Sequence, residues 1–223
     1  MTIWPAIWLT LQLAGMTTLI LLVLGMPLAW WLATTRSPLR PVVEAITTLP
    51  LVLPPTVLGF YLLILLSPSA PVGAFWLRLT GETLTFNFRG LVLASCLYSL
   101  PFAIQPMQTA FAGLGHGALQ AARTLGASGW DAFRTIALPL ARRGVLTAAV
   151  LTFAHTMGEF GVVLMVGGNI PGETRVIAIE IFTAVETLDY QTAHILSAGL
   201  LVFSFLVLLA VYVLNGKGVR PLG

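Results

Sequence analysis

Residues 115–139, GHGALQAARTLGASGWDAFRTIALP, form two short helical patterns joined by a turn. The first pattern is rich in alanine and stops at Gly126, a residue type that suits the left-handed conformation closing many helices. The second begins with Ser128 as N-cap and Asp131 three residues later, an approximate capping box. Because proline interrupts a helix, we expect this second helix to end before Pro139. The stretch therefore predicts a helix–turn–helix elbow.

The two faces of this elbow differ: one is small and the other apolar. Small residues let another surface approach closely, and exposed apolar groups mark interfaces, so we expect the elbow to dock on a partner. The alternative is an amphipathic elbow lying on the lipid surface, where arginines would meet anionic headgroups. Those arginines are Arg123, Arg134, Arg142 and Arg143.

The rest of the chain has the composition of a membrane protein. Of its 223 residues, 57% are hydrophobic and 9% are charged, whereas a soluble domain carries roughly a quarter charged residues. We therefore expect an all-α integral membrane protein. The net charge of +3 is too small to indicate nucleic-acid binding, and a single cysteine, Cys96, excludes an internal disulfide or a multi-cysteine metal site.

Five apolar stretches are long enough to cross a bilayer, which takes about 20 residues of helix. We expect a single transmembrane domain over residues 1–223, with Pro27 kinking its first helix. A sixth candidate, 176–188, is too short and carries Glu180 and Glu186, so we expect a surface or re-entrant helix there. The predicted spans are 7–33, 48–67, 90–113, 144–166 and 194–214.

Basic residues orient these spans. With five spans, segments 34–47, 114–143 and 215–223 share one side and hold eight lysines and arginines; the other side holds three. Such residues concentrate in cytoplasmic loops. We therefore expect the N-terminus outside, the 114–143 loop and the C-terminus inside, and an external loop with a short helix over 167–193.

The second span begins LPLVLPPTVLGF, with Pro50, Pro54 and Pro55 in its first turns. Broken helices are tolerated at membrane depth where they pack in protein or line a watery cavity. This pattern predicts either a helix that lines a pathway or a kinked packing helix.

The elbow resembles the cytoplasmic signature of permease subunits of ABC importers, which is Glu-Ala-Ala, a glycine four residues later, then Ile-any-Leu-Pro. Gln120 replaces the usual glutamate, which removes one possible ion pair and leaves the other positions and the spacing unchanged. The resemblance implies a type I importer transmembrane fold with this elbow as coupling helix. The matching or adjoining residues are Gln120, Ala121, Ala122, Arg123, Gly126, Ile136, Leu138 and Pro139.

The same resemblance implies the partners. They are an ABC ATPase in two copies, a second copy of this chain, membrane lipid, and a periplasmic or surface oxyanion-binding protein, in a bacterial inner membrane. The sequence contains no G-x-x-x-x-G-K-[ST] phosphate loop. We therefore expect ATP and Mg²⁺ at the ATPase partner, no cofactor on this chain, and no enzymatic activity of its own.

Three further stretches resemble the molybdate branch of these permeases: residues 49–63, HTMGEFG at 155–161, and GGNIPGETR at 167–175. The GEFG element is shared with sulfate and thiosulfate permeases. The resemblance therefore implies molybdate or tungstate as the substrate, with sulfate or thiosulfate as the alternative.

Glu159 is an acidic residue inside the fourth predicted span, one helical turn after His155. An ionised carboxylate would repel an anion, so we expect Glu159 to brace the broken helix through hydrogen bonds rather than bind substrate. Gly158 and Gly161 would permit the close approach that a brace requires. A place in the translocation pathway is the other hypothesis for Glu159 and Gly161.

The external loop GNIPGETR, 168–175, carries Asn169, Glu173 and Arg175. These residues either contact the binding protein or outer gate, or form a solvated Pro-Gly turn.

Two other classes of protein fit the sequence less well. Ion-gradient-driven transporters usually show internal repeats, and none is evident here. An intramembrane enzyme would need clustered catalytic groups, but the three histidines, His116, His155 and His194, are dispersed. Lone histidines of this kind are more often packing or surface residues.

Overall fold

The computed structural model describes residues 3–114, 126 and 128–216. All regular structure in these ranges is helical. The helices are α1 (Trp4–Thr34), α2 (Arg40–Val52), α3 (Pro55–Leu66), α4 (Pro71–Thr80), α5 (Phe88–Ala112), α7 (Gly129–Ala132), the π-helical turn η1 (Phe133–Ala137), α8 (Leu138–Met157), α9 (Gly161–Gly167), α10 (Ile177–Glu186) and α11 (Tyr190–Gly216).

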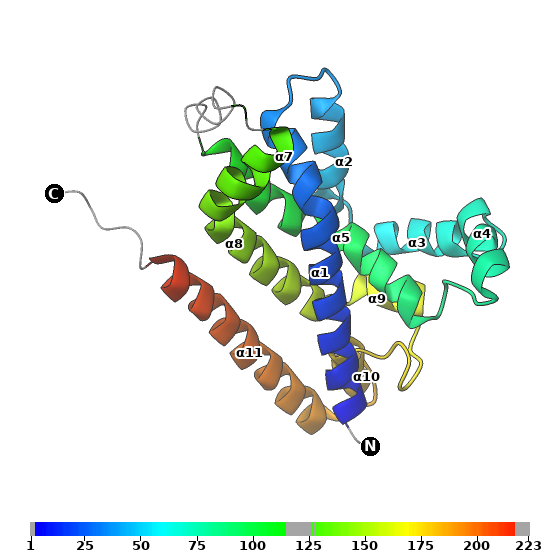
Figure 1. The fold of residues 1–223 in the computed structure, drawn as a ribbon. Coiled ribbons are helices and arrows are strands. Elements are labelled where there is room, and N and C mark those ends of the chain that lie inside the picture. The colour runs from blue at the N-terminus through cyan, green and yellow to red at the C-terminus, as the bar shows by residue number, and fades with distance from the viewer. Residues whose placement is uncertain (1–2, 115–125, 127, 217–223) are drawn as a thin grey trace.

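Helices α1, α5 and α8 form the centre of the bundle, and α11 lies along its side (Figure 1). The largest buried cluster joins these three helices with η1 and consists mainly of aliphatic side chains. Its fully buried members include Ala29, Leu32, Ala103, Ile104, Met107, Ala137 and Ala148. The narrow alanine side chains let the helices approach closely enough for the larger ones to interdigitate.

Within the described residues, four continuous helical stretches are long and apolar enough to cross a membrane. They are α1, α5, the run Gly129–Met157 and α11. A fifth candidate is the bent pair α2 and α3. Helix α10 has ten residues and is therefore about 15 Å long, too short for a span.

The stretch 48–67 contains the helix break that its prolines predict. Helix α2 ends at Val52, α3 begins at Pro55, and the two axes differ by 114°. Pro54 is the N-cap of α3 and Pro55 its first residue, so both occupy positions where a missing N–H costs nothing. Helices α3 and α4 consequently project sideways from the bundle (Figure 1).

The second helix of the elbow does not end before Pro139, contrary to the prediction. Helices α7, η1 and α8 form one continuous run from Gly129 to Met157. Proline clashes with the preceding turn of an α-helix. Here that turn is π-helical, with the Leu138 N–H bonded to the Phe133 carbonyl, and this wider turn accommodates Pro139.

The start of this run confirms two local predictions. Ser128 and Asp131 form a capping box in which the Ser128 hydroxyl accepts the Asp131 N–H at 3.1 Å. Gly126 has φ +83°, the left-handed conformation expected of a glycine that closes a helix. The residues that precede Gly126 in the elbow, 115–125, lie outside the described ranges.

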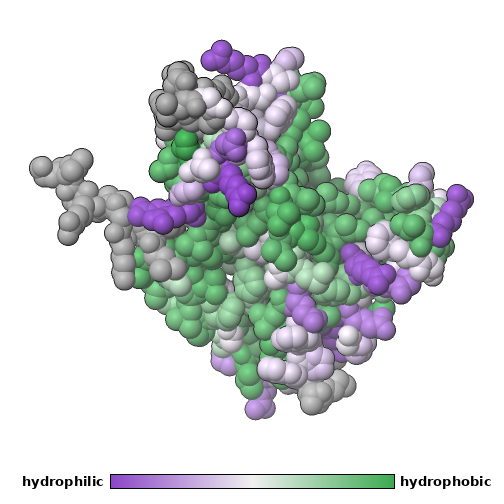
Figure 2. Space-filling model, in the orientation of Figure 1, coloured by the Kyte–Doolittle hydropathy of each residue, from purple (hydrophilic) through white to green (hydrophobic). Residues whose placement is uncertain are grey.

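Figure 2 shows a broad hydrophobic surface over the bundle, with hydrophilic residues gathered at its ends and on the projecting arm of α3 and α4. One end carries the turn between α1 and α2 together with α7, and the opposite end carries the N-terminus and α10 (Figure 1). This distribution is the one required of a bundle whose middle contacts lipid.

A buried hydroxyl joins α1 to α10. Thr10 accepts the backbone N–H of Ile177 at 2.9 Å and donates to the Ala6 carbonyl at 2.7 Å. Ile177 is the first residue of α10. The N-cap residue, Val176, has an apolar side chain that cannot accept a hydrogen bond from the N–H groups of this helix end. Thr10 therefore supplies from another helix the acceptor that a helix N-terminus needs.

We expect Thr10→Val to destabilise the protein by about 1–3 kcal/mol, because the isosteric change leaves a buried N–H without an acceptor. Thermal unfolding in detergent measures the effect. Thr18→Val is the matched control on α1, since the Thr18 hydroxyl is buried and has no hydrogen-bond partner in the described structure. Equal losses in the two variants would contradict this role of Thr10.

Candidate functional site

A cavity of about 560 Å³ lies where two helix breaks meet. One break separates α2 from α3; the other interrupts the predicted span 144–166, since α8 ends at Met157 and α9 starts at Gly161. The cavity is lined by Pro55, Thr56, Tyr98, Ala154, His155, Gly158, Glu159, Phe160 and Gly161. Three of the predicted pathway or brace residues, Pro55, Glu159 and Gly161, thus come together, while Pro50 and Pro54 are not among the lining residues.

The first turns of α3 and α9 touch directly beside this cavity. A Cβ added at Gly161 would lie 2.8 Å from the Pro55 Cβ, closer than side chains pack. Gly158, in contrast, would meet only carbonyl oxygens at 3.9 and 4.0 Å. The expected close approach therefore depends on Gly161, and the same expectation for Gly158 is wrong.

Aromatic and hydroxyl side chains of α5 contact the His155 ring. Its ring stacks on Phe102 with centroids 3.9 Å apart and lies 4.8 Å from the ring of Tyr98. Its Nδ1 is 3.0 Å from the Ser99 hydroxyl, which is also 2.9 Å from the Thr156 hydroxyl. Sequence reasoning missed Thr56, Tyr98 and Ser99, because residues more than 50 positions from His155 meet it only in the folded bundle.

Glu159 does not form the hydrogen-bonded brace predicted from the sequence. The residue is only 3% exposed, and neither of its carboxylate oxygens has a hydrogen-bond partner within the described chain. The Ser95 hydroxyl faces the carboxyl group without completing a hydrogen bond. The break between α8 and α9 instead leaves this carboxyl enclosed between α9 and α5, where an unpaired negative charge would be costly.

Polar side chains connect the loop 168–175 to α10. Arg175 donates to Asn169 Oδ1 at 2.5 Å and lies 3.5 Å from a carboxylate oxygen of Glu180. Asn169 in turn donates to the Thr183 hydroxyl at 3.2 Å. Asn169 and Arg175 therefore share one cluster that fixes the loop, whereas Glu173 is exposed and outside it.

The structure describes only some of the predicted coupling residues. Gln120, Ala121, Ala122 and Arg123 lie outside the described residues. Ile136 and Leu138 are half-buried along the run Gly129–Met157, and Pro139 is exposed. Close to them, Trp130 is 66% exposed and stacks on the buried Phe133 with ring centroids 5.5 Å apart, so the described part of the elbow exposes one large aromatic side chain.

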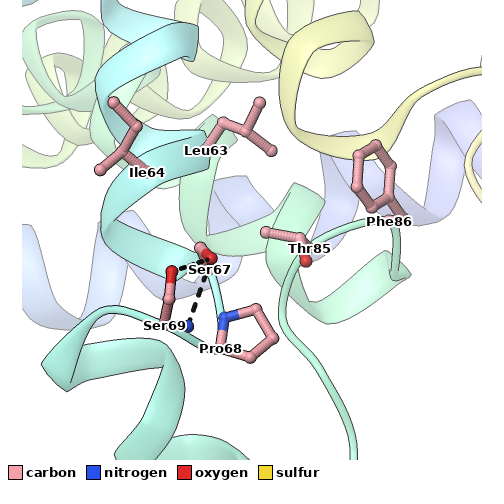
Figure 3. Close-up of a pocket in the computed structure, with 7 residues that line it drawn as sticks. All are labelled: Leu63, Ile64, Ser67, Pro68, Ser69, Thr85 and Phe86. Carbon is pink, nitrogen blue, oxygen red and sulfur yellow. Dashed lines mark hydrogen bonds between the residues drawn. The ribbon is translucent and has the colours of Figure 1, made fainter.

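A second cavity, of about 370 Å³, lies between the end of α3 and the segment before α5 (Figure 3). Its two serine hydroxyls, Ser67 and Ser69, are 2.8 Å apart and bond to each other. The Ser67 hydroxyl also accepts the Ser69 N–H at 3.3 Å, so both serines are held within this turn. Nowhere in the described ranges do three or more potential metal ligands cluster.

Comparison with known proteins identifies the family to which this chain belongs. The family model described as "Binding-protein-dependent transport system inner membrane component" matches residues 3–217. The chain belongs to this family. It is therefore a multi-pass inner-membrane component of a binding-protein-dependent transport system, and the ion-gradient-driven and enzymatic alternatives are set aside.

Two relatives and one solved structure define the similarity further. The molybdenum transport system permease protein ModB of Azotobacter vinelandii is 57% identical over 207 residues, which cover 93% of this chain and 92% of the relative. The sulfate transport system permease protein CysT of Escherichia coli is 32% identical, covering 90% and 73%. The MetNI methionine ABC transporter has the same fold, with a TM-score of 0.74 at 19% identity, covering 96% of this chain and 95% of that one. The expected ABC-importer transmembrane fold is thus confirmed.

The contact between Pro55 and Gly161 yields a direct test. We expect Gly161→Ala to destabilise the protein by about 1–3 kcal/mol through overpacking, since the contacted atom belongs to a rigid proline ring. Gly158→Ala is the control in the same break and should unfold within a few tenths of a kcal/mol of the parent. Thermal unfolding in detergent compares them, and a Gly161→Ala protein as stable as its control would refute this packing.

Proposed function

We propose that this chain is the permease subunit of an ATP-driven importer that carries molybdate, or the related tungstate, into the cell. The observation that carries the proposal is the 57% identity to a molybdenum permease across nearly the whole of both chains. The sulfate permease is similar at a lower level, 32% identity, and makes sulfate the second candidate. The HTMGEFG and NIPGETR stretches fall within this similarity.

The proposed complex contains two copies of this chain and two of a separate ABC ATPase, which binds ATP and Mg²⁺. Two copies would provide two coupling elbows, one for each ATPase. The absence of a phosphate-loop motif from the sequence supports a separate ATPase. A periplasmic or surface protein would deliver the oxyanion to the side carrying α10 and the Asn169–Arg175 loop.

The elbow would then face the cytoplasm. Support comes from the basic residues of this end: of the described ones, Arg36, Arg40, Arg134, Arg142 and Arg143 lie on α2, on α8 or in the segments that lead into them. Positive side chains concentrate on the cytoplasmic side of inner-membrane proteins. In this orientation the N-terminus is external and the C-terminus is internal.

Uptake by reconstituted proteoliposomes tests the proposed substrate. With the partner ATPase inside and loaded molybdate-binding protein outside, we expect ATP-dependent accumulation of molybdate that a tenfold excess of sulfate on a sulfate-binding protein does not suppress. Each component is omitted in turn as a control. Uptake that prefers sulfate, or that continues on an ion gradient without ATP, would overturn the proposal.

A second test addresses the elbow. We expect Ala122→Trp to block docking on the ATPase, because the proposed contact requires a small side chain, and to lower molybdate uptake at least about tenfold, a loss equivalent to about 1.4 kcal/mol. Thermal unfolding of the isolated permease should remain unchanged. Thr187→Trp, on the opposite end of the molecule, is the control and should bind the ATPase normally. Normal coupling in Ala122→Trp would show that the elbow is not the docking element.

A further inference from the structure

One assignment of hydrogens satisfies all three hydrogen bonds around His155 at once. In it, the Thr156 hydroxyl donates its only hydrogen to the Thr152 carbonyl at 2.9 Å. Thr156 then accepts from Ser99 across their 2.9 Å contact. With its own hydrogen used there, the Ser99 hydroxyl can only accept from His155 Nδ1 at 3.0 Å. The chain of hydroxyls thus places the proton of the neutral imidazole on Nδ1.

The other ring nitrogen opens onto the cavity. His155 is a lining residue, and its Nε2 has no hydrogen-bond partner within the described chain and is not among the buried polar atoms. When the ring is neutral, Nε2 presents a lone pair to the cavity and repels an anion. When the ring is protonated, both nitrogens donate and Nε2 becomes a positively charged donor.

Aromatic rings and one hydroxyl surround His155 at the cavity wall. The faces of Phe102 and Tyr98 lie 3.9 and 4.8 Å from the ring, and aromatic faces attract cations. Thr56 adds a hydroxyl donor at the first turn of α3. The lining residues include no lysine or arginine, so an anion that enters the described cavity can obtain a full positive charge only from His155.

Few other titratable groups surround His155. Helices α1 and α9 carry none, and α5 contributes Tyr98 to the cavity and Cys96 behind it. The turn between α8 and α9 contributes Glu159, whose oxygens are buried. Titratable side chains on α3 and α11 are outside the lining; they are Tyr61, Tyr190, His194 and Tyr212.

We propose that the cavity between the two helix breaks is a transit site for the tetrahedral oxyanion, and that His155 binds the anion there through Nε2 only in its imidazolium form. The oxyanion and one proton would then occupy the site together. Ser99 acts as a positioning residue, because it holds the tautomer that makes binding depend on this proton. The inference rests on the proposed function and assigns a specific residue to it.

The test measures molybdate uptake by the complete reconstituted complex at equal pH on both sides of the membrane, from pH 6 to 8.5. The imidazolium form is lost as the pH rises, so wild-type uptake relative to ATP hydrolysis should fall across this range. His155→Phe preserves the stacked ring without either nitrogen and should reduce uptake at pH 6 at least about tenfold, with no further decline. His194→Phe, the same change on α11, should behave as wild type.

Ser99→Ala separates the proposed role from a general loss of stability. Without the acceptor at Nδ1, a neutral imidazole can carry its proton on Nε2 and donate to the anion. Uptake by Ser99→Ala should therefore decline less with pH than wild-type uptake does, whereas a merely destabilised protein would lose a constant fraction at every pH. This readout stands even if His155→Phe fails to assemble.

The outcomes distinguish the inference from the function on which it rests. Wild-type import of molybdate together with an unchanged pH profile in both variants would overturn the role of His155 and leave the proposed function intact. A wild-type complex that hydrolyses ATP with loaded binding protein but imports no molybdate would overturn the proposed function, and the transit site with it.

Discussion

An interrupted helix in an apolar bundle exposes backbone groups that lipid cannot satisfy, so each break must be covered by protein. In this molecule the break between α2 and α3 packs against the break between α8 and α9. The start of α3 packs on the start of α9 through the contact between Pro55 and Gly161. The cavity lies beside that contact, and His155 and Glu159 are among the residues that line it.

Local chemistry was predictable from the sequence where a few neighbouring residues decide it. The proline cluster around Pro54 indicated a broken helix, and Ser128 and Asp131 indicated a helix start; both features are present. Pro139 was misinterpreted because the standard rule assumes an α-helical turn before it. The turn before Pro139 is instead π-helical, with an i→i−5 hydrogen bond from the Leu138 N–H to the Phe133 carbonyl, and it accommodates the proline ring. No residue pattern in the sequence predicted this turn.

The site was less predictable than the fold because its members come from distant segments. Glu159 was expected to be hydrogen-bonded, as buried polar groups usually are, yet it is unpaired in the described structure. His155 was set aside as an ordinary packing histidine. Only the folded contacts with Ser99, Phe102 and Tyr98 distinguish it, and those partners lie some 50 residues away in the chain.

The π-helical turn at Phe133–Ala137 has a mechanical consequence. By keeping the backbone helical past Pro139, it joins the elbow to the cavity through one continuous helical run from Gly129 to Met157. A non-helical break at the proline would absorb a displacement of the elbow. A hydrogen-bonded run instead passes part of that displacement to its far end, where His155 lines the cavity wall and the chain turns into α9.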